Sequence, residues 1–381
     1  MVINMKNLLH VSSRLNANFG GGERFTQILL SGLGDYNNVF IGGHKILLDI
    51  FQKQGYEAIN YSAGIEPTGL KKTLLSPYSF LRSLWEVIRY NGQFRKADLV
   101  ICDVSTLAEA VFLFPYITHI FKKPILFINH WGNVPDHVIK SPFFGILKYN
   151  LSKCHQVYVS NYQFQKWSDN NLTNYLSSVI HNGVSVSEFK PTIRKADKIF
   201  TIGYMSRIDN MKGFDTLINA LSMVKTDQDL LIKLGGEGQY ISQYQELQNS
   251  LDIPKNITIQ WLGNIDNTQE FYESLDLFVF PSKFESFGLV GIEAMERGIP
   301  VIFNTIDSFK EIMNIQGIDI PQLFFEPNDS NSLAQLITDS INNPELYSIG
   351  TKTKLHNFVV NNYSQSKMIN EYIEYINKII N

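Results

Sequence analysis

The sequence has few cysteines, no long hydrophobic run and no strong excess of either charge. Cys102 and Cys154 are the only cysteines among 381 residues, and their spacing is not that of metal ligands, so we expect buried thiols in a reducing compartment. The longest apolar run, Ala110 to Phe121, contains Pro115 and is shorter than the ~18 residues that a membrane-spanning helix requires. The start of the chain also lacks a signal-peptide pattern. We therefore expect a protein that is made and kept in the cytoplasm.

The overall charge is nearly balanced, but the two halves of the chain differ. The 33 basic and 36 acidic residues give a net charge of −3, which argues against a nucleic-acid partner. Residues 1–190 hold 18 basic and 12 acidic residues, a balance of +6. Residues 191–381 hold 15 basic and 24 acidic residues, a balance of −9. Such an asymmetry can matter for the choice of partners.

Short apolar segments alternate with longer amphipathic ones, a pattern that predicts α/β units with parallel sheets. The expected strands are Asn7–Ser12, Asn38–Ile41, Leu99–Cys102, Ile125–Asn129, Gln156–Val159, Ser178–His181, Phe200–Met205, Leu230–Leu234, Ile257–Leu262, Leu275–Phe280, Pro300–Asn304 and Gln322–Phe325. Two similar sets of strands predict two Rossmann-like, doubly wound domains facing a cleft. The segment from Asn182 to Lys198 lacks sustained periodicity and reads as the linker between them.

One passage of the second half carries the clearest chemical signal. The apolar run ending at Phe280 is followed by Glu285 and Glu293, eight positions apart, and a helix-like segment continues to Arg297. A loop that enters a helix offers unpaired N–H groups and a positive dipole end, which suit a diphosphate. Flanking carboxylates can accept hydrogen bonds from hydroxyls. A nucleotide-sugar, with phosphates between two hydroxyl-rich sugars, fits this arrangement.

This passage resembles the Glu-x7-Glu motif of the retaining glycosyltransferases of family 4, which have the GT-B fold. Glu285 matches the first glutamate and Glu293 the second, and the flanking pattern FPSxxESFGLVxxEAMxxGxPVI is present through Ile302. Without the flanking pattern, an amphipathic helix start with Glu293 as a surface charge would explain the two glutamates.

Two cations follow the strand that ends at Met205. Arg207 and Lys212 could neutralise a diphosphate, the arginine with a fork of donors and the lysine as a point charge. The passage is similar to the family's GRxxxxKG motif, with Ser206 in place of the first glycine. Taken alone, two cations on a loop are more often solvated.

A glycine-rich turn, residues 235–238, ends the next strand. It is similar to the family's GxGP turn, which borders the nucleotide base, although Gln239 stands where the proline often sits. A plain tight turn is an equally good interpretation. Such glycines at the carboxyl end of a strand are typical of places where a ligand approaches the backbone.

The first half contains weaker signals. Residues 20–25 read Gly-Gly-Gly-Glu-Arg-Phe, but Phe25 replaces the third glycine of a dinucleotide fingerprint, and no suitable acid follows the next strand. The run resembles the family's GGxER loop, which faces the donor phosphate and the acceptor. His130 follows the run Ile125–Ile128, where the family has a histidine that touches the sugar's hydroxyls.

The resemblance implies a two-domain enzyme that transfers a sugar, with retention, from a UDP- or GDP-linked donor to a glycan or lipid-linked glycan. It implies the domains 1–183 on the acceptor side, 199–365 for the nucleotide-sugar, a linker at 184–198 and a final helix, 366–381, that crosses back to the first domain. It implies catalytic roles for Lys212, Arg207, Glu285 and His130, and donor contacts from Gly21, Gly22, Gly236, Glu237, Ser286, Phe287, Gly288, Leu289 and Glu293.

No cofactor and no metal are expected. The Asp-x-Asp spacing of Asp227 and Asp229, which sugar transferases of another fold use for metal binding, is explained by a turn before a strand. Two alternatives remain open: a phosphorylase or epimerase on the same fold, and a degenerate subunit that supports a partner enzyme.

Residues 67–96 form a possible membrane face. They hold six basic residues and one acid, Glu86, while Leu81, Leu84, Trp85 and Ile88 share one helical face. A basic amphipathic helix with aromatic residues can lie on an anionic membrane. The alternative is a helix that packs this apolar face on the sheet and leaves its arginines in solvent.

Overall fold

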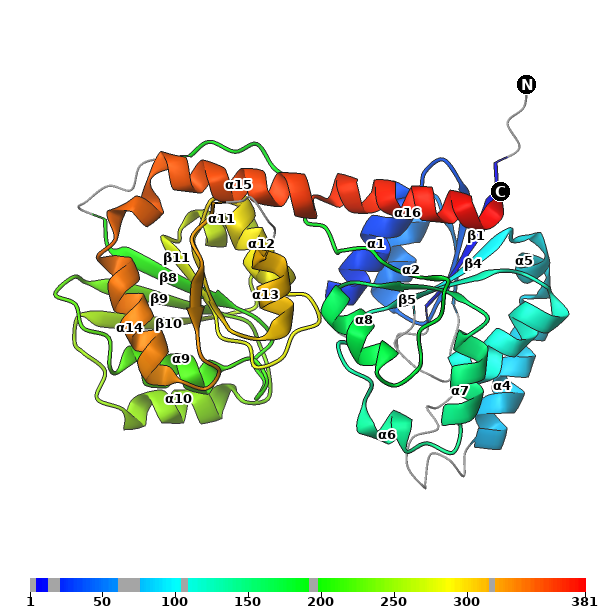
Figure 1. Cartoon of the computed structure of the whole chain (residues 1–381), viewed down its shortest axis with the longest axis horizontal. Helices are drawn as coiled ribbons and strands as arrows, with labels where there is room; N and C mark the ends of the chain where they lie inside the picture. The colour runs from blue at the N-terminus through cyan, green and yellow to red at the C-terminus, as the bar shows by residue number, and fades with distance from the viewer. Residues whose placement is uncertain (1–4, 13–20, 61–75, 104–108, 192–197, 315–318) are drawn as a thin grey trace. The chain divides into compact units, whose positions relative to one another are not determined.

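The chain folds into two compact α/β units (Figure 1). The computed structural model describes residues 5–12, 21–60, 76–103, 109–191, 198–314 and 319–381. The first unit contains residues 1–182 and 368–381, and the second contains residues 183–367. Each is built on a parallel sheet with helices, so the expected fold class is confirmed. No helix in the described ranges combines the length and the apolar character needed to cross a bilayer.

The sheet of the first unit has seven strands in the order β3-β2-β1-β4-β5-β6-β7. Its strands are β1 (Asn7–Ser12), β2 (Asn37–Gly42), β3 (Glu57–Asn60), β4 (Leu99–Asp103), β5 (Ile125–Asn129), β6 (His155–Tyr158) and β7 (Ser177–Val179). The sequence analysis missed β3. This four-residue edge strand exposes Glu57 and Asn60 and buries no residue fully, so it lacks the apolar run that marks the other strands.

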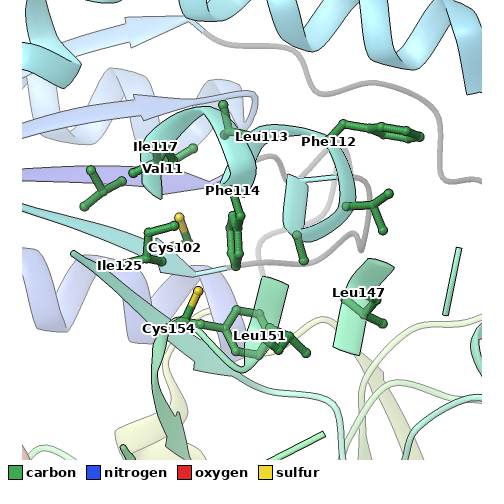
Figure 2. Packing of buried hydrophobic residues seen from close by; sticks show 14 of the residues in the cluster. Val11, Cys102, Phe112, Leu113, Phe114, Ile117, Ile125, Leu147, Leu151 and Cys154 are labelled. Carbon is green, nitrogen blue, oxygen red and sulfur yellow. The ribbon is translucent and has the colours of Figure 1, made fainter. Parts of the chain in front are cut away.

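The helices of this unit lie around its sheet. They are α1 (Gly21–Gly32), α2 (Lys45–Lys53), α4 (Ser76–Arg89), α5 (Asn91–Lys96), α6 (Asp136–Ile139), α7 (Phe144–Leu151), α8 (Asn161–Ser168) and α16 (Gln365–Ile380), with π-helices η1 (Glu109–Leu113) and η2 (Tyr116–Ile120). Cys102 and Cys154 lie in the core that Figure 2 shows, close to Phe114 and Leu151. Both cysteines are buried, as expected, and burial raises the pKa of Cys154 to about 12.

The last helix of the chain completes a further core cluster of the first unit. Met368, Tyr372 and Ile376 of α16 are buried together with Phe25 and Leu29 of α1. The apolar face of α16 therefore packs on a cluster whose other buried residues all come from the first half of the chain.

The sheet of the second unit has six strands in the order β10-β9-β8-β11-β12-β13. They are β8 (Phe200–Met205), β9 (Leu230–Gly235), β10 (Ile257–Gly263), β11 (Leu277–Phe280), β12 (Val301–Asn304) and β13 (Leu323–Phe325), close to the six expected runs. The helices are α9 (Phe214–Leu221), α10 (Ile241–Ser250), α11 (Thr268–Glu273), α12 (Leu289–Glu296), α13 (Asp307–Met313), α14 (Ser330–Ile341) and α15 (Ile349–Tyr363), with the 3₁₀ helix η3 (Pro344–Tyr347).

The described part of the expected linker is tied to the second unit. Val184 accepts a backbone hydrogen bond from Gln365 at 2.8 Å. Ser187 donates from both its backbone N–H and its hydroxyl to the buried Glu296 carboxylate, at 2.9 and 3.1 Å.

Both sheets reverse their strand order once, between β1 and β4 and between β8 and β11. In an open parallel sheet, ligands bind outside the carboxyl ends of the strands at such a switch point. The loops that follow these four strands are therefore the places where a site is expected.

His10 makes the stability of the first unit depend on pH. Its Nε2 lies 2.9 Å from Oδ1 of Asn38, and burial lowers its pKa from the usual 6.5 to about 4, although Asn38 and the charge of Asp103 oppose this shift. The unfolded chain therefore binds this proton at a higher pH than the folded protein. The stabilisation is present above about pH 6.5 and is lost as the pH falls towards 4.

We expect the free energy of unfolding to drop by on the order of 2 kcal/mol between pH 7 and pH 5 from this group. His10→Gln, which keeps a polar group opposite Asn38 but does not titrate, should remove that part of the pH dependence in urea titrations. His137→Gln, at an exposed histidine of the same unit, is the control and should retain it. An unchanged pH slope in His10→Gln would contradict the assignment.

Candidate active site

The loops after β8 and β11 are packed backbone to backbone. Lys283 donates its N–H to the carbonyl of Met211 at 2.8 Å. Gly213 begins α9 with a φ of 71°, and a Cβ at this position would lie 2.1 Å from the carbonyl oxygen of Pro281. Only glycine permits both the positive φ and this close approach. The two loops that flank the switch point are therefore held in contact at this position.

Lys212 and Glu285 meet across these loops. The ammonium of Lys212 forms an ion pair with Glu285, whose same oxygen accepts the hydroxyl of Ser282 at 3.2 Å. Both charged side chains are only 17% exposed. The hydroxyl of Tyr204, on β8, donates to the carbonyl of Lys212 at 2.9 Å and fixes its backbone. The structure thus brings together one predicted cation and one predicted carboxylate, from residues 73 positions apart.

Arg207 lies in a different environment. Its side chain is 74% exposed and its guanidinium donates to the carboxylate of Asp209, with Nη2 at 2.8 Å and Nε at 2.9 Å. The structure therefore does not show Arg207 bound to either predicted glutamate. The sequence analysis did not single out Asp209, although a carboxylate two positions after a loop arginine is a usable signal for such a pair.

The glycine-rich turn after β9 packs on the loop that carries Arg207. Gly236 has a φ of 125°, and a Cβ on it would lie 1.8 Å from the carbonyl oxygen of Ser206. The N–H of Ile208 donates to the carbonyl of Glu237 at 2.9 Å, while the Glu237 side chain is exposed. The turn is therefore more than a connection between elements, because it sets the position of the adjacent loop.

Helix α12 begins at this edge of the sheet. Gly288 precedes it with a φ of 102°, and a Cβ there would meet the ring of Phe309 at 2.6 Å. Ser286 and Leu289, on either side, are partly exposed. The ring of Phe287 is buried and packs edge-on against Tyr363, so that only the backbone of Phe287 is suited to a ligand.

Glu293 lies one turn into α12. Its Oε2 accepts the hydroxyl of Tyr272, on α11, at 3.0 Å, and the same hydroxyl lies 3.2 Å from the carbonyl of Val290. Tyr272 orients the glutamate and was missed by the sequence analysis, since nothing in the spacing relates α11 to α12.

A second polar cluster lies at the switch point of the first unit. Nε2 of His130, which follows β5, is 3.0 Å from Oδ1 of Asp103, the last residue of β4. The hydroxyl of Thr26, in the first turns of α1, hydrogen-bonds the other carboxylate oxygen. The ring of Phe25 packs edge-on against the imidazole, with centroids 4.5 Å apart.

The predicted glycines of this unit lie beside that cluster. Gly21 is exposed at the first position of α1, and the carbonyl of Gly22 lies 3.1 Å from the hydroxyl of Thr26. Gly20 lies outside the described residues. Asp103 and Thr26 were not predicted, because a buried polar pair is visible only once β4 and α1 are adjacent.

In the second unit, a lysine, an exposed arginine, a helix start and two carboxylates suit the binding of an anion that carries hydroxyl groups. Within the described ranges, no group of three or more histidine, cysteine, aspartate or glutamate side chains has the arrangement of a metal site. Asp227 and Asp229 are exposed in the turn before β9.

Comparisons with known proteins agree with this geometry. Residues 185–354 match the family model of glycosyl transferases group 1. Over 93% of its length the chain is 24% identical to an uncharacterized glycosyltransferase of Haemophilus influenzae, of which it covers 95%. It is also 24% identical, over 76% of its length, to the O-antigen chain mannosyltransferase RfbU of Salmonella typhimurium, of which it covers 77%.

Solved structures share the fold at low sequence identity. HepE of Anabaena, crystallised with UDP and glucose, aligns over 98% of this chain and 100% of its own with a TM-score of 0.76 and 16% identity. The lipopolysaccharide outer core galactosyltransferase WaaB aligns over 98% of this chain and 99% of its own with a TM-score of 0.73 and 14% identity.

The chain therefore has the two-domain GT-B fold of these glycosyltransferases. The match of residues 185–354 to the model of glycosyl transferases group 1 is consistent with the family resemblance found in the sequence.

Lys212 is expected to matter most for turnover. Lys212→Ala should lower kcat by roughly 10²–10³, the cost of losing one preorganised group that stabilises developing charge. Lys255→Ala, at an exposed lysine of the same unit, is the matched control and should leave kcat unchanged. Thermal unfolding should show that both variants remain folded. Near-normal turnover in folded Lys212→Ala would contradict the expected role of Lys212 in stabilising developing negative charge.

Proposed function

We propose that this protein is a retaining glycosyltransferase of family 4 that moves a sugar from a UDP- or GDP-linked donor to an acceptor hydroxyl. The observation that carries the proposal is the ion pair between Lys212 and Glu285 at the switch point of the second sheet, beside the start of α12. It supports the proposal because it combines a cation for a phosphate with a carboxylate for a hydroxyl.

Breaking the glycosidic bond places negative charge on the departing nucleotide diphosphate. Lys212, Arg207 and the N–H groups around Phe287–Leu289 stabilise this charge from positions set before the reaction. The diphosphate competes with Glu285 for the Lys212 ammonium, so donor binding frees Glu285 to accept a sugar hydroxyl. Glu293, already oriented by Tyr272, binds the ribose hydroxyls.

The remaining contacts follow the same logic. The backbone of Gly236 and Glu237 borders the base, and Ser286 contacts the phosphates beside the helix start. In the first unit, His130 binds a hydroxyl of the transferred sugar. The backbone N–H groups of Gly21 and Gly22 donate hydrogen bonds to the donor phosphate. Because cations and N–H dipoles supply the charge stabilisation, the reaction needs neither a metal ion nor a cofactor.

The relatives of this chain support a role in cell-surface polysaccharide or glycolipid assembly. They include an O-antigen chain mannosyltransferase and a lipopolysaccharide core biosynthesis mannosyltransferase of Rhizobium meliloti. The acceptor we propose is accordingly a glycan or a lipid-linked glycan. The UDP in the HepE structures favours a UDP-linked donor as the first to be tested.

The proposal is tested by a thermal-shift panel of nucleotide-sugars, followed by NMR analysis of the product made with the best binder. We expect one donor to raise Tm, transfer of its sugar with the anomeric configuration retained, and undiminished activity in EDTA. Inversion would contradict the retaining mechanism, and loss in EDTA with recovery in Mn²⁺ or Mg²⁺ would contradict metal independence.

The same panel separates the alternatives. Turnover that requires inorganic phosphate would indicate a phosphorylase, and conversion of the donor without an acceptor would indicate an epimerase. A protein that binds donors but turns over none, alone or with acceptor glycans, would be a binding subunit.

A specific surface feature favours membrane contact as part of this function. On helix α4, Leu81, Trp85 and Ile88 are 62, 60 and 62% exposed, whereas Ser83, Glu86 and Val87 are buried. The interpretation that this apolar face packs on the sheet is therefore wrong for these three residues. The first part of the 67–96 segment, up to residue 75, lies outside the described residues.

Basic residues accompany the exposed apolar face. Arg89, at the end of α4, and Arg95 and Lys96, at the end of α5, are exposed. Each base near an anionic surface contributes about 1 kcal/mol, and apolar side chains add to that binding when they enter the headgroup region. We propose that this face contacts the anionic inner leaflet of the cell membrane, where a lipid-linked acceptor is presented.

Vesicle co-sedimentation tests the membrane contact. The protein should bind phosphatidylserine-containing vesicles at low salt and be released at high salt, because the attraction is screened. Replacing Leu81, Trp85 and Ile88 by serine, or Arg89, Arg95 and Lys96 by glutamine, should weaken binding. Ile349→Ser, at an exposed apolar residue of the second unit, is the control. Binding that none of these changes affects would refute the proposed face, while the transferase assignment would stand.

A further inference from the structure

Asn304 is a fully buried polar residue at the carboxyl end of β12, and it has no role in the function proposed so far. Strand β12 pairs with β11, so Asn304 lies beside the point where the loop that carries Glu285 leaves the sheet. A side-chain amide at such a depth costs free energy unless its donor and acceptor atoms are hydrogen-bonded.

The amide of Asn304 forms hydrogen bonds in two directions. Its Nδ2 donates to the carbonyl of Ser282 at 2.6 Å and lies 3.5 Å from the carbonyl of Pro281. Its Oδ1 accepts the backbone N–H of Ile306 at 3.3 Å. Since carbonyls lie on one side and an N–H on the other, these partners fix the orientation of the amide. The side chain therefore links the loop after β11 to the loop after β12.

Ser282 connects this link to a predicted site residue. It is also fully buried, and its hydroxyl donates to Oε1 of Glu285 at 3.2 Å. The same oxygen receives the ammonium of Lys212. In the function we propose, the diphosphate draws Lys212 away from the glutamate. The Ser282 hydroxyl stays with Glu285, because Asn304 holds the backbone that carries it.

We infer that Asn304 is a positioning residue that holds the loop after β11, so that the Ser282 hydroxyl keeps the Glu285 carboxylate oriented towards the donor sugar after Lys212 has turned to the diphosphate. This inference rests on the proposed function for its catalytic consequence. The hold of Asn304 on the loop is a property of the resting protein.

The hold on the loop is measured by hydrogen–deuterium exchange of the full chain without ligand. The N–H of Lys283 donates to the carbonyl of Met211 at 2.8 Å, which protects it while the loop is in place. Asn304→Ala should speed exchange in peptides that cover residues 281–289 by about 10-fold, the scale of one lost hydrogen bond in a local opening.

Asn256→Ala is the matched control. The side-chain amide of Asn256 also donates to two backbone carbonyls, those of Thr226 and Gln228, at 2.9 and 2.8 Å. Asn256 directly precedes β10 and therefore lies at the amino edge of the same parallel sheet, opposite the edge where the candidate site lies. Asn256→Ala should leave both the exchange of residues 281–289 and kcat/KM unchanged.

The catalytic consequence is measured by a double-mutant cycle. Asn304→Ala should lower kcat/KM by about 10- to 100-fold, since small displacements of a group at the reacting centre have effects of this size. Ser282→Ala should cause a loss of about the same size, that of one hydrogen bond to a charged group. Adding Asn304→Ala to Ser282→Ala should cause little further loss, because the asparagine acts through the serine.

Asn304→Asp separates hydrogen bonding from packing, because the two side chains have nearly the same shape. A protonated carboxyl keeps one donor for the carbonyl of Ser282 and one acceptor for the N–H of Ile306, whereas an ionised carboxylate has no donor. Burial raises the pKa of an aspartate at this position. The ratio of its kcat/KM to that of the wild type should therefore rise as the pH falls from about 8 to about 6, while the ratio for Asn304→Ala stays flat.

Neighbouring charges do not obscure this comparison. Lys283 and Glu285 lie on the loop that Asn304 holds, and Glu326 accepts the hydroxyl of Thr305 at 3.1 Å. Each of these groups is present in both proteins, so its own titration cancels when the variant is compared with the wild type at the same pH.

The outcomes separate this inference from the proposed function. Additive losses in the cycle, a flat ratio for Asn304→Asp, or unchanged exchange of residues 281–289 in Asn304→Ala would overturn the role of Asn304 even in an active transferase. If no donor is turned over, the proposed function fails, and the exchange measurement alone still decides whether Asn304 holds the loop. Should Asn304→Ala fail to fold, Asn304→Asp supplies both readouts, with faster exchange and lower kcat/KM expected at the higher pH.

Discussion

The candidate site depends on how closely the backbones of three loops approach one another. The loops after β8, β9 and β11 all leave the carboxyl edge of one parallel sheet, and glycines stand where they touch. Gly213 and Gly236 combine a positive φ with a position that would place any Cβ against a neighbouring carbonyl oxygen. These contacts are between backbone atoms, so rotation of side chains cannot change them. They therefore hold Lys212 and Glu285 at a defined separation.

The charges at this site are balanced in the resting protein. Lys212 is neutralised by Glu285, and Arg207 by Asp209. In the function we propose, a diphosphate displaces carboxylates from both cations, because it brings more negative charge and more acceptor oxygens than either one. Until then the Lys212–Glu285 pair keeps two mostly buried charges satisfied, and each freed carboxylate becomes available for a hydroxyl.

In two places of the first unit, polar side chains are buried or apolar side chains are exposed, which is the reverse of the usual distribution. Helix α4 buries Ser83 and Glu86 and exposes Leu81, Trp85 and Ile88. The switch point buries Asp103 beside His130. Neither arrangement favours folding on its own, because burying polar groups and exposing apolar ones both cost free energy. At such positions the residues do not maximise folding stability, and we interpret them as selected for contacts with other molecules.

The sequence by itself determined the elements and the chemical class. Alternating strands and helices can be recognised from the local pattern of apolar residues, and the motif around Glu285 and Glu293 lies within one short stretch of sequence. The sequence could not reveal β3, since this exposed edge strand lacks an apolar run. Only the tertiary structure decided which charges pair, that Tyr272 orients Glu293, that Asp103 lies between His130 and Thr26, and which way α4 faces. These depend on residues far apart in the chain becoming neighbours, and a helix with one apolar stripe has the same local pattern whether that stripe is buried or exposed.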